Sequence, residues 1–98
     1  MPSVRRTAQF SLWLKNLRDK GARGRIVSRV ERLEAGNFGD VAPVGNGVSE
    51  MRIHYGAGYR VYFIRRGEEL IVLLCGGDKS SQSKDIATAK QLARDYED

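Results

Sequence analysis

The chain has 98 residues, which suffice for one hydrophobic core and not for two, so we expect a single domain over residues 1–98. Seventeen Lys and Arg against twelve Asp and Glu give a net charge of +5, and 41% of the residues are hydrophobic, which argues against a disordered chain. No apolar run reaches the length of a membrane span, and no signal peptide is recognised at the basic N-terminus. The single cysteine, Cys75, excludes an intramolecular disulfide. We therefore expect a cytoplasmic protein without membrane contact.

Helical periodicity dominates the first third of the chain. Thr7 is a suitable N-cap for a helix with one apolar stripe, formed by Phe10, Trp13, Leu14 and Leu17. Because Gly21 interrupts this pattern and Gly36 suits a left-handed stop, a second helix is expected from about residue 22 to residue 35. The short connection predicts an antiparallel helical hairpin. Residues 3–6 before it are long enough for one short strand.

The positive charge is concentrated in these predicted helices. Residues 1–36 hold nine Lys and Arg but only three acidic residues, whereas the rest of the chain is nearly balanced. Such a basic half favours a polyanion or an acidic protein as partner. A solvated helix face explains the same charges, and the count alone leaves both interpretations open.

Period-two alternation follows, and it predicts a meander of strands. Residues 48–55 and 59–65 alternate on either side of the glycine-rich turn at residues 56–58. Residues 70–75 are apolar on both faces, as in a strand with a neighbour on each side, and Gly76 and Gly77 are expected to end that strand. A final helix carries a stripe of Ile86, Ala89, Ala93 and Tyr96. The predicted order is β-α-α-β-β-β-α, an α+β fold with a mainly antiparallel sheet.

The glycine turn also predicts a register for the hairpin. If Tyr55 and Tyr59 flank a three-residue loop, Met51 faces Phe63 and Ile53 faces Val61, which pairs apolar residues on the core side. On the other side the same register places His54 opposite Arg60 and Arg52 opposite Tyr62. This arrangement predicts a polar patch on rigid strands.

Two interpretations of this patch remain open. Arg52 and Arg60 could bind a phosphate, because guanidinium groups hold phosphate oxygens bidentately and stay protonated. Alternatively Glu50, two residues before Arg52, could form a structural salt bridge with it. Histidine is the residue type that most often carries protons near neutral pH, so His54 could do so, although a lone histidine is more often structural. Tyr62 could stack on a base, or it could simply pack.

The types of residue that are missing narrow the chemistry. The sequence has no second histidine, no Cys/His cluster for zinc and no Ser-His-Asp set at a nucleophile elbow. The remaining Arg, Lys, Tyr and His side chains suit cleavage of RNA, in which the 2′-hydroxyl of the substrate is the nucleophile. The Gly76-Gly77-Asp78-Lys79 segment before the last helix could hold an anion or could be an ordinary capped loop, and Cys75 beside it is expected to be a buried filler.

Two segments together resemble a known family. MRIHYGAGYRVYF (51–63) and LLCGGDKSSQSKDI (73–86) are similar to RelE/HigB-type toxins of bacterial type II toxin–antitoxin modules, in particular the phage-related "addiction module killer protein" branch. The resemblance implies a RelE-like fold, with an N-terminal helical hairpin and a C-terminal helix packed on the sheet. It further implies an endoribonuclease that cuts mRNA on the translating ribosome and a cognate helix-turn-helix antitoxin as partner. Arg52, Arg60 and Lys79 match the basic positions that grip the scissile phosphate, with His54 as a possible proton carrier.

We expect this cleavage to need neither a metal nor another cofactor, and we expect the basic helices to contact ribosomal RNA. The residues proposed for RNA contact are Tyr62, Arg18, Lys20, Arg23, Arg25 and Arg29, with Arg32 beside them. Two alternatives remain. A ParE-like toxin of similar architecture would inhibit DNA gyrase without cutting nucleic acid, and an RNA-binding module would bind without catalysis.

Overall fold

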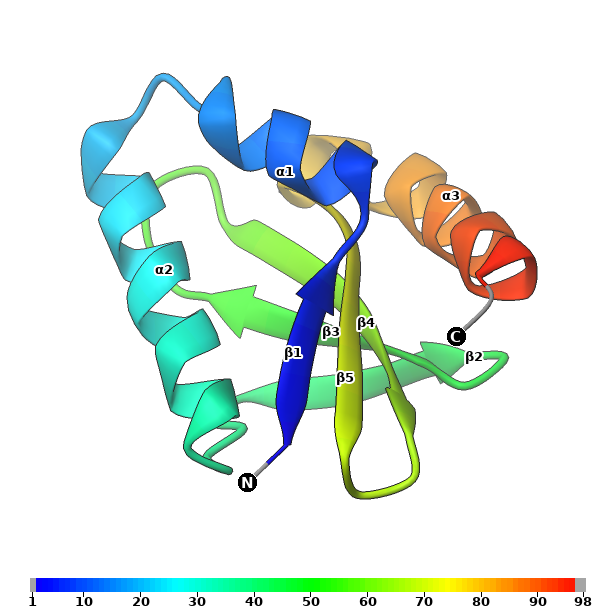
Figure 1. Cartoon of the computed structure of the whole chain (residues 1–98). Helices are drawn as coiled ribbons and strands as arrows, with labels where there is room; N and C mark the ends of the chain where they lie inside the picture. The colour runs from blue at the N-terminus through cyan, green and yellow to red at the C-terminus, as the bar shows by residue number, and fades with distance from the viewer. Residues whose placement is uncertain (1, 97–98) are drawn as a thin grey trace.

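A five-stranded mixed sheet forms the centre of the molecule, and the computed structural model describes residues 2–96 of it (Figure 1). The elements in chain order are β1 (Ser3–Arg6), α1 (Ala8–Lys15), α2 (Lys20–Glu34), β2 (Val41–Gly45), β3 (Val48–Ile53), β4 (Tyr59–Arg66), β5 (Leu70–Gly77), the short 3₁₀ helix η1 (Lys79–Ser81) and α3 (Gln82–Asp95). The strand order is β1-β5-β4-β3-β2, with β1 parallel to β5 and the other neighbours antiparallel. The α+β class is confirmed, with one strand more than the sequence predicts.

The additional strand is β2, which pairs only with β3 at the edge of the sheet. The sequence of β2 is not typical of a strand. Pro43 lacks a backbone donor, and Gly45 has a positive φ of 102° where the pairing shifts register. Proline is tolerated at an edge, where one side of the strand needs no partner. The prediction of four strands was therefore wrong at the position where local propensity is weakest.

The two N-terminal helices begin at side-chain caps. Thr7 accepts a hydrogen bond from the Phe10 N–H at 3.0 Å, as predicted, and Asp19 accepts one from the Ala22 N–H at 3.1 Å. Because Asp19 caps it, α2 begins at Lys20 and contains Gly21, so the predicted break at this glycine was wrong. The antiparallel hairpin is also not formed. Figure 1 shows α1 crossing one end of the sheet and α2 turning away from it at a steep angle.

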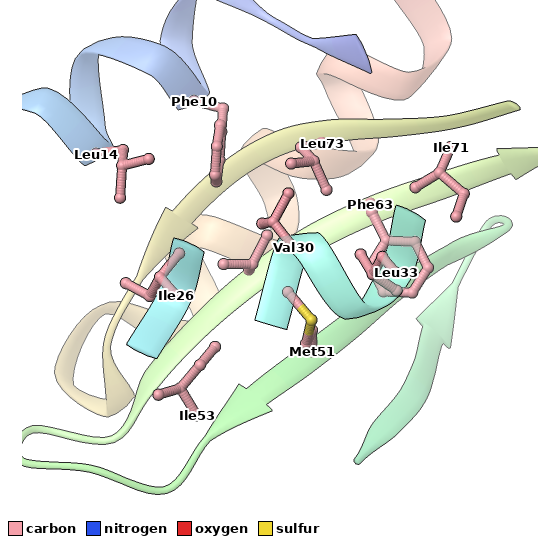
Figure 2. Close-up of a cluster of buried hydrophobic side chains, with 11 residues drawn as sticks. Phe10, Leu14, Ile26, Val30, Leu33, Met51, Ile53, Phe63, Ile71 and Leu73 are labelled. Atoms are coloured by element: carbon pink, nitrogen blue, oxygen red, sulfur yellow. The ribbon is translucent and has the colours of Figure 1, made fainter. Parts of the chain in front are cut away.

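Hydrophobic side chains fill both sides of the sheet. The first cluster lies under α1 and α2 and is drawn in Figure 2, where Phe10, Ile26 and Val30 point toward Met51 and Leu73 on the strands. The second cluster packs Ala89 of α3 against the opposite side of the sheet. Each helix thus buries its stripe on the sheet, which explains why α1 and α2 do not pair with each other.

Strand β5 confirms the prediction of a central strand, because it lies between β1 and β4 with apolar residues on both faces. It does not end at Cys75, however, but continues through Gly76 and Gly77. A Cβ atom at Gly76 would overlap the Trp13 ring, and one at Gly77 would overlap the Asp85 carboxylate. These glycines therefore allow α1 and α3 to approach the strand closely, and they do not interrupt it.

Candidate functional site

A cavity of about 490 Å³ opens where β3 ends and β4 begins, next to η1 and the start of α3. We call it the hairpin pocket. It is lined by Glu50, Arg52, His54, Tyr55, Gly56, Gly58, Arg60, Lys79 and Gln82. All four residues that the sequence analysis assigned to catalysis line this one cavity, although they come from β3, the β3–β4 loop, β4 and η1.

The register of the hairpin differs from the prediction by two residues. Arg52 lies opposite Arg60, Met51 opposite Val61 and Ile53 opposite Tyr59, because the loop spans residues 54–58 in place of the three expected. A shift of two keeps every side chain on its predicted face. The correction therefore brings the two arginines directly together and removes His54 from the strand.

Glu50 connects the two arginines. Its carboxylate is nearly buried and accepts a hydrogen bond from Arg52 Nε at 2.9 Å, while Arg60 Nε lies 3.8 Å away. Gln82 Nε2 donates to the other carboxylate oxygen at 3.0 Å. The structural salt bridge considered from the sequence is therefore formed. The hydrogen bond that Arg52 donates to Glu50 raises the pKa of Arg52.

Glu50 nevertheless does not balance the charge of the hairpin pocket. It is the one carboxylate among the lining residues, which also include three side-chain cations. Arg60 is only 8% exposed, and its buried Nε has no hydrogen-bond partner in the part of the chain that the structure describes. A buried guanidinium without a full set of acceptors is costly, so the pocket favours an additional anion.

Lys79 supplies the third cation. The backbone N–H of Lys79 donates to the Ala57 carbonyl at 3.4 Å, and its stem lies against Gly58, where a Cβ atom would come within 3.0 Å of Lys79 Cγ. The side chain is exposed, and its ammonium has neither a hydrogen bond nor an ion pair within residues 2–96. The β3–β4 loop and η1 thus position a free ammonium group at the mouth of the pocket.

His54 lies at the rim and is paired with a residue that the sequence analysis did not consider. A hydrogen bond of 2.5 Å joins His54 Nε2 to Asp40 Oδ2, and Asp40 Oδ1 lies 3.8 Å from Arg52 Nη1. The hydrogen bond from His54 lowers the pKa of Asp40, and the positive charge of Arg52 adds to the effect. Asp40 thereby orients the imidazole at the entrance.

The structure separates the residues predicted to contact RNA. Arg23 donates to the Lys15 and Leu17 carbonyls, each at 2.9 Å, and so satisfies the end of α1. Arg29 donates to the Arg52 carbonyl at 2.6 Å and to two loop carbonyls, so it fixes α2 to the end of β3. The guanidinium groups of Arg23 and Arg29 therefore make structural contacts with backbone carbonyls of the protein. The other basic residues of this group, Arg18, Lys20, Arg25 and Arg32, are exposed.

Tyr62 does not fit its predicted role. The side chain is fully buried beneath α3, so its ring has no face available for a base. The hydroxyl has no hydrogen-bond partner among the described residues, and burial raises the pKa of this phenol. Cys75 is buried in the same cluster, as expected, and burial raises the pKa of its thiol to about 12.

Three residues of the site were missed or undervalued. Gln82 holds Glu50, Asp40 holds His54, and Tyr55 lines the pocket. Asp40 precedes the unrecognised strand β2, so no local pattern connected it with His54. Gln82 comes just after the predicted anion segment, and its side chain meets β3 only in the folded chain.

Two further kinds of feature are absent from the described part of the chain, residues 2–96. No three His, Cys, Asp or Glu side chains in it form a group that could hold a metal ion. None of its helices has the length and apolar character of a membrane span.

Comparison with known proteins gives the class to which this fold and site belong. Residues 12–95 match the family described as Phage derived protein Gp49-like (DUF891), so the chain belongs to that family. The family is associated with the killer toxins of addiction modules. An uncharacterized protein of Haemophilus influenzae is 47% identical over 92 residues, which cover 94% of this chain and 93% of the relative.

Proposed function

We propose that this protein is the toxin of a type II toxin–antitoxin module, of RelE/HigB type and with a RelE-like fold, and that it is an endoribonuclease acting on mRNA at the ribosome in the cytoplasm. The cognate antitoxin is proposed to be a helix-turn-helix protein. The observation that carries the proposal is the excess of cations in the hairpin pocket, where Arg52, Arg60 and Lys79 line one cavity and Glu50 is the one lining carboxylate.

The proposed reaction uses a nucleophile from the substrate. The ribose 2′-oxygen attacks the adjacent phosphorus and loses its proton, the bond from phosphorus to the 5′-oxygen breaks, and that oxygen takes up a proton. The products are a 2′,3′-cyclic phosphate and a 5′-hydroxyl. Arg60 and Lys79 would bind the non-bridging oxygens and stabilise the charge of the pentavalent phosphate. Arg52 would bind the phosphate with the guanidinium N–H groups that are not used by Glu50.

Proton movement is assigned to the rim of the pocket. His54 is 71% exposed, lines the cavity and is oriented by Asp40. These are the properties that a histidine needs in order to exchange protons with a bound substrate. The ammonium of Lys79 is the other exposed proton donor in the pocket. His54 and Lys79 are therefore the two groups proposed to move protons in the reaction.

The test compares two exposed lysines. Lys79→Ala removes a cation from the hairpin pocket, whereas Lys84→Ala removes one from an α3 residue that does not line the pocket. We expect Lys79→Ala to lower translation-coupled mRNA cleavage by about 10²- to 10³-fold, the usual loss when one donor to a developing oxyanion is removed. The control should cleave like the wild type and leave the same cyclic phosphate ends.

Three results would contradict the proposal. The first is growth arrest by Lys79→Ala at wild-type strength, which would show that the activity does not depend on the hairpin pocket. The second is inhibition of gyrase supercoiling by the purified protein with all transcripts intact, which would favour the ParE-like alternative. The third is binding of RNA without cleavage, which would favour the alternative of a binding module.

A further inference from the structure

A second cavity, of about 240 Å³, lies beside the hairpin pocket between α2 and the C-terminal end of β3. We call it the α2 groove. It is lined by Arg25, Ser28, Arg29, Arg32, Ile53 and His54. Because His54 lines both cavities, the two are neighbours on one face of the molecule. In Figure 1 the loop between β3 and β4 passes beside α2, where Arg25 of the helix lies over the Tyr55 ring of the loop.

The α2 groove is built for an anion. Its lining contains three arginines and no carboxylate. Arg29 forms the wall, because its guanidinium donates to the carbonyls of Arg52, Phe38 and Asp40. Arg32, by contrast, has no side-chain hydrogen bond or ion pair within the described part of the chain, and it is exposed. A free guanidinium is therefore held beside a fixed one in a concave site.

Arg25 joins the two cavities. Its guanidinium lies over the Tyr55 ring, 4.4 Å from the ring centroid, and Tyr55 lines the hairpin pocket while Arg25 lines the α2 groove. Guanidinium planes and aromatic rings are the surfaces on which proteins stack unpaired bases. Asp40, which bonds the His54 side chain between the two cavities, is already engaged by that contact and lies near Arg52.

We propose that the α2 groove binds the phosphate next to the scissile one, so that one RNA strand runs from the hairpin pocket past His54 to Arg25 and Arg32. The inference rests on the proposed function of the hairpin pocket and adds a second phosphate site to it. The ligand is thus a single-stranded RNA with at least two phosphodiesters. Arg25 and Arg32 contact the substrate in this arrangement, whereas Arg23 and Arg29 shape the protein.

The experiment compares two short RNAs by NMR chemical-shift titration of the whole protein. One is a dinucleotide with a single phosphodiester and the other a trinucleotide with two, both carrying 2′-O-methyl groups so that neither can be cut. The wild type should bind the trinucleotide roughly 10-fold more tightly, which corresponds to one additional charge-assisted contact. The logarithmic salt dependence should steepen by about 0.7 for the second phosphate.

The variant Arg25→Gln/Arg32→Gln should lose this 10-fold gain and keep the dinucleotide affinity. Lys15→Gln/Lys84→Gln removes the same charge from residues that line neither cavity, and it should keep the gain. Because Arg25 packs on Tyr55, its loss could disturb the fold. The single variant Arg32→Gln, which removes a side chain without a hydrogen bond or ion pair within residues 2–96, should still lose most of the gain.

The outcomes test the α2 groove and the hairpin pocket separately. If the dinucleotide binds through Lys79 but the trinucleotide gains nothing, or gains equally in Arg25→Gln/Arg32→Gln, the α2 groove is not a phosphate site and the hairpin pocket still is. An equal loss in the Lys15→Gln/Lys84→Gln control would show general electrostatic attraction, which also overturns the inference. If the dinucleotide does not bind, or binds equally to Lys79→Ala, both the inference and the proposed function fail.

Discussion

Glu50 is the residue whose loss should reveal most about the hairpin pocket. The carboxylate lies between Arg52 and Arg60, which face each other across β3 and β4, and its side chain is only 3% exposed. Glu50→Gln keeps the shape and keeps an acceptor for Gln82, but it leaves two opposed guanidinium groups without a buried counter-charge. The variant should therefore be less stable, and its stability should depend on anions in the buffer.

The magnitude follows from the exposure of the two arginines. Removing one partner of a fully buried ion pair costs about 3–5 kcal/mol. Arg52 is 38% exposed, so solvent screens its share, whereas Arg60 is 10% exposed but lies 3.8 Å from the carboxylate, beyond a direct hydrogen bond. We expect a loss of about 2–3 kcal/mol in the free energy of unfolding. For a chain of this size the melting temperature should fall by roughly 10–20 °C.

Thermal unfolding in chloride and in phosphate buffer is the assay. Phosphate at ten times its dissociation constant should return about 1.4 kcal/mol to Glu50→Gln, because the ion replaces the missing carboxylate. Glu68→Gln, which changes an exposed acid in the β4–β5 turn, is the matched control and should melt like the wild type in both buffers. A Glu50→Gln variant as stable as the wild type, or one indifferent to phosphate, would refute the reasoning about uncompensated charge.

Three other predictions concern single groups. Tyr62→Phe removes a buried hydroxyl that has no partner among the described residues, so it should leave stability unchanged or raise it by about 1 kcal/mol in denaturant titration; a clear loss would reveal a hidden partner. His54→Ala should raise the pKa of Asp40 toward its ordinary range in a carboxyl NMR titration, since the hydrogen bond from His54 is the largest cause of the depression. Ionised Asp40 stabilises the fold above its unfolded pKa, and in the wild type this contribution should be lost only as the pH falls through the lower folded value, below about pH 4. The Cys75 thiol, with a pKa of about 12, should resist an aromatic disulfide reagent at pH 8 in the native protein and react after unfolding; rapid native labelling would contradict its burial.

The sequence by itself determined the face on which each hairpin residue lies. Alternation has a period of two, so Arg52 and Arg60 share the side opposite Met51 and Ile53 in either register. The predicted register was nonetheless wrong by two residues, because a five-residue loop and a three-residue loop preserve the same alternation. The central position of β5 and the helix cap at Thr7 were also predictable, since each depends on residues close together in the chain.

Only the tertiary structure decided which of these groups meet. Asp40 reaches His54 because β2 returns beside β3, and Gln82 reaches Glu50 because α3 packs behind the sheet. Most charged residues that line the hairpin pocket were recognised in the sequence, but the partners Asp40 and Gln82 were not. Ion pairing depends on distances of a few ångström between residues far apart in the chain, and those distances are set by strand pairing and helix packing that no local pattern contains.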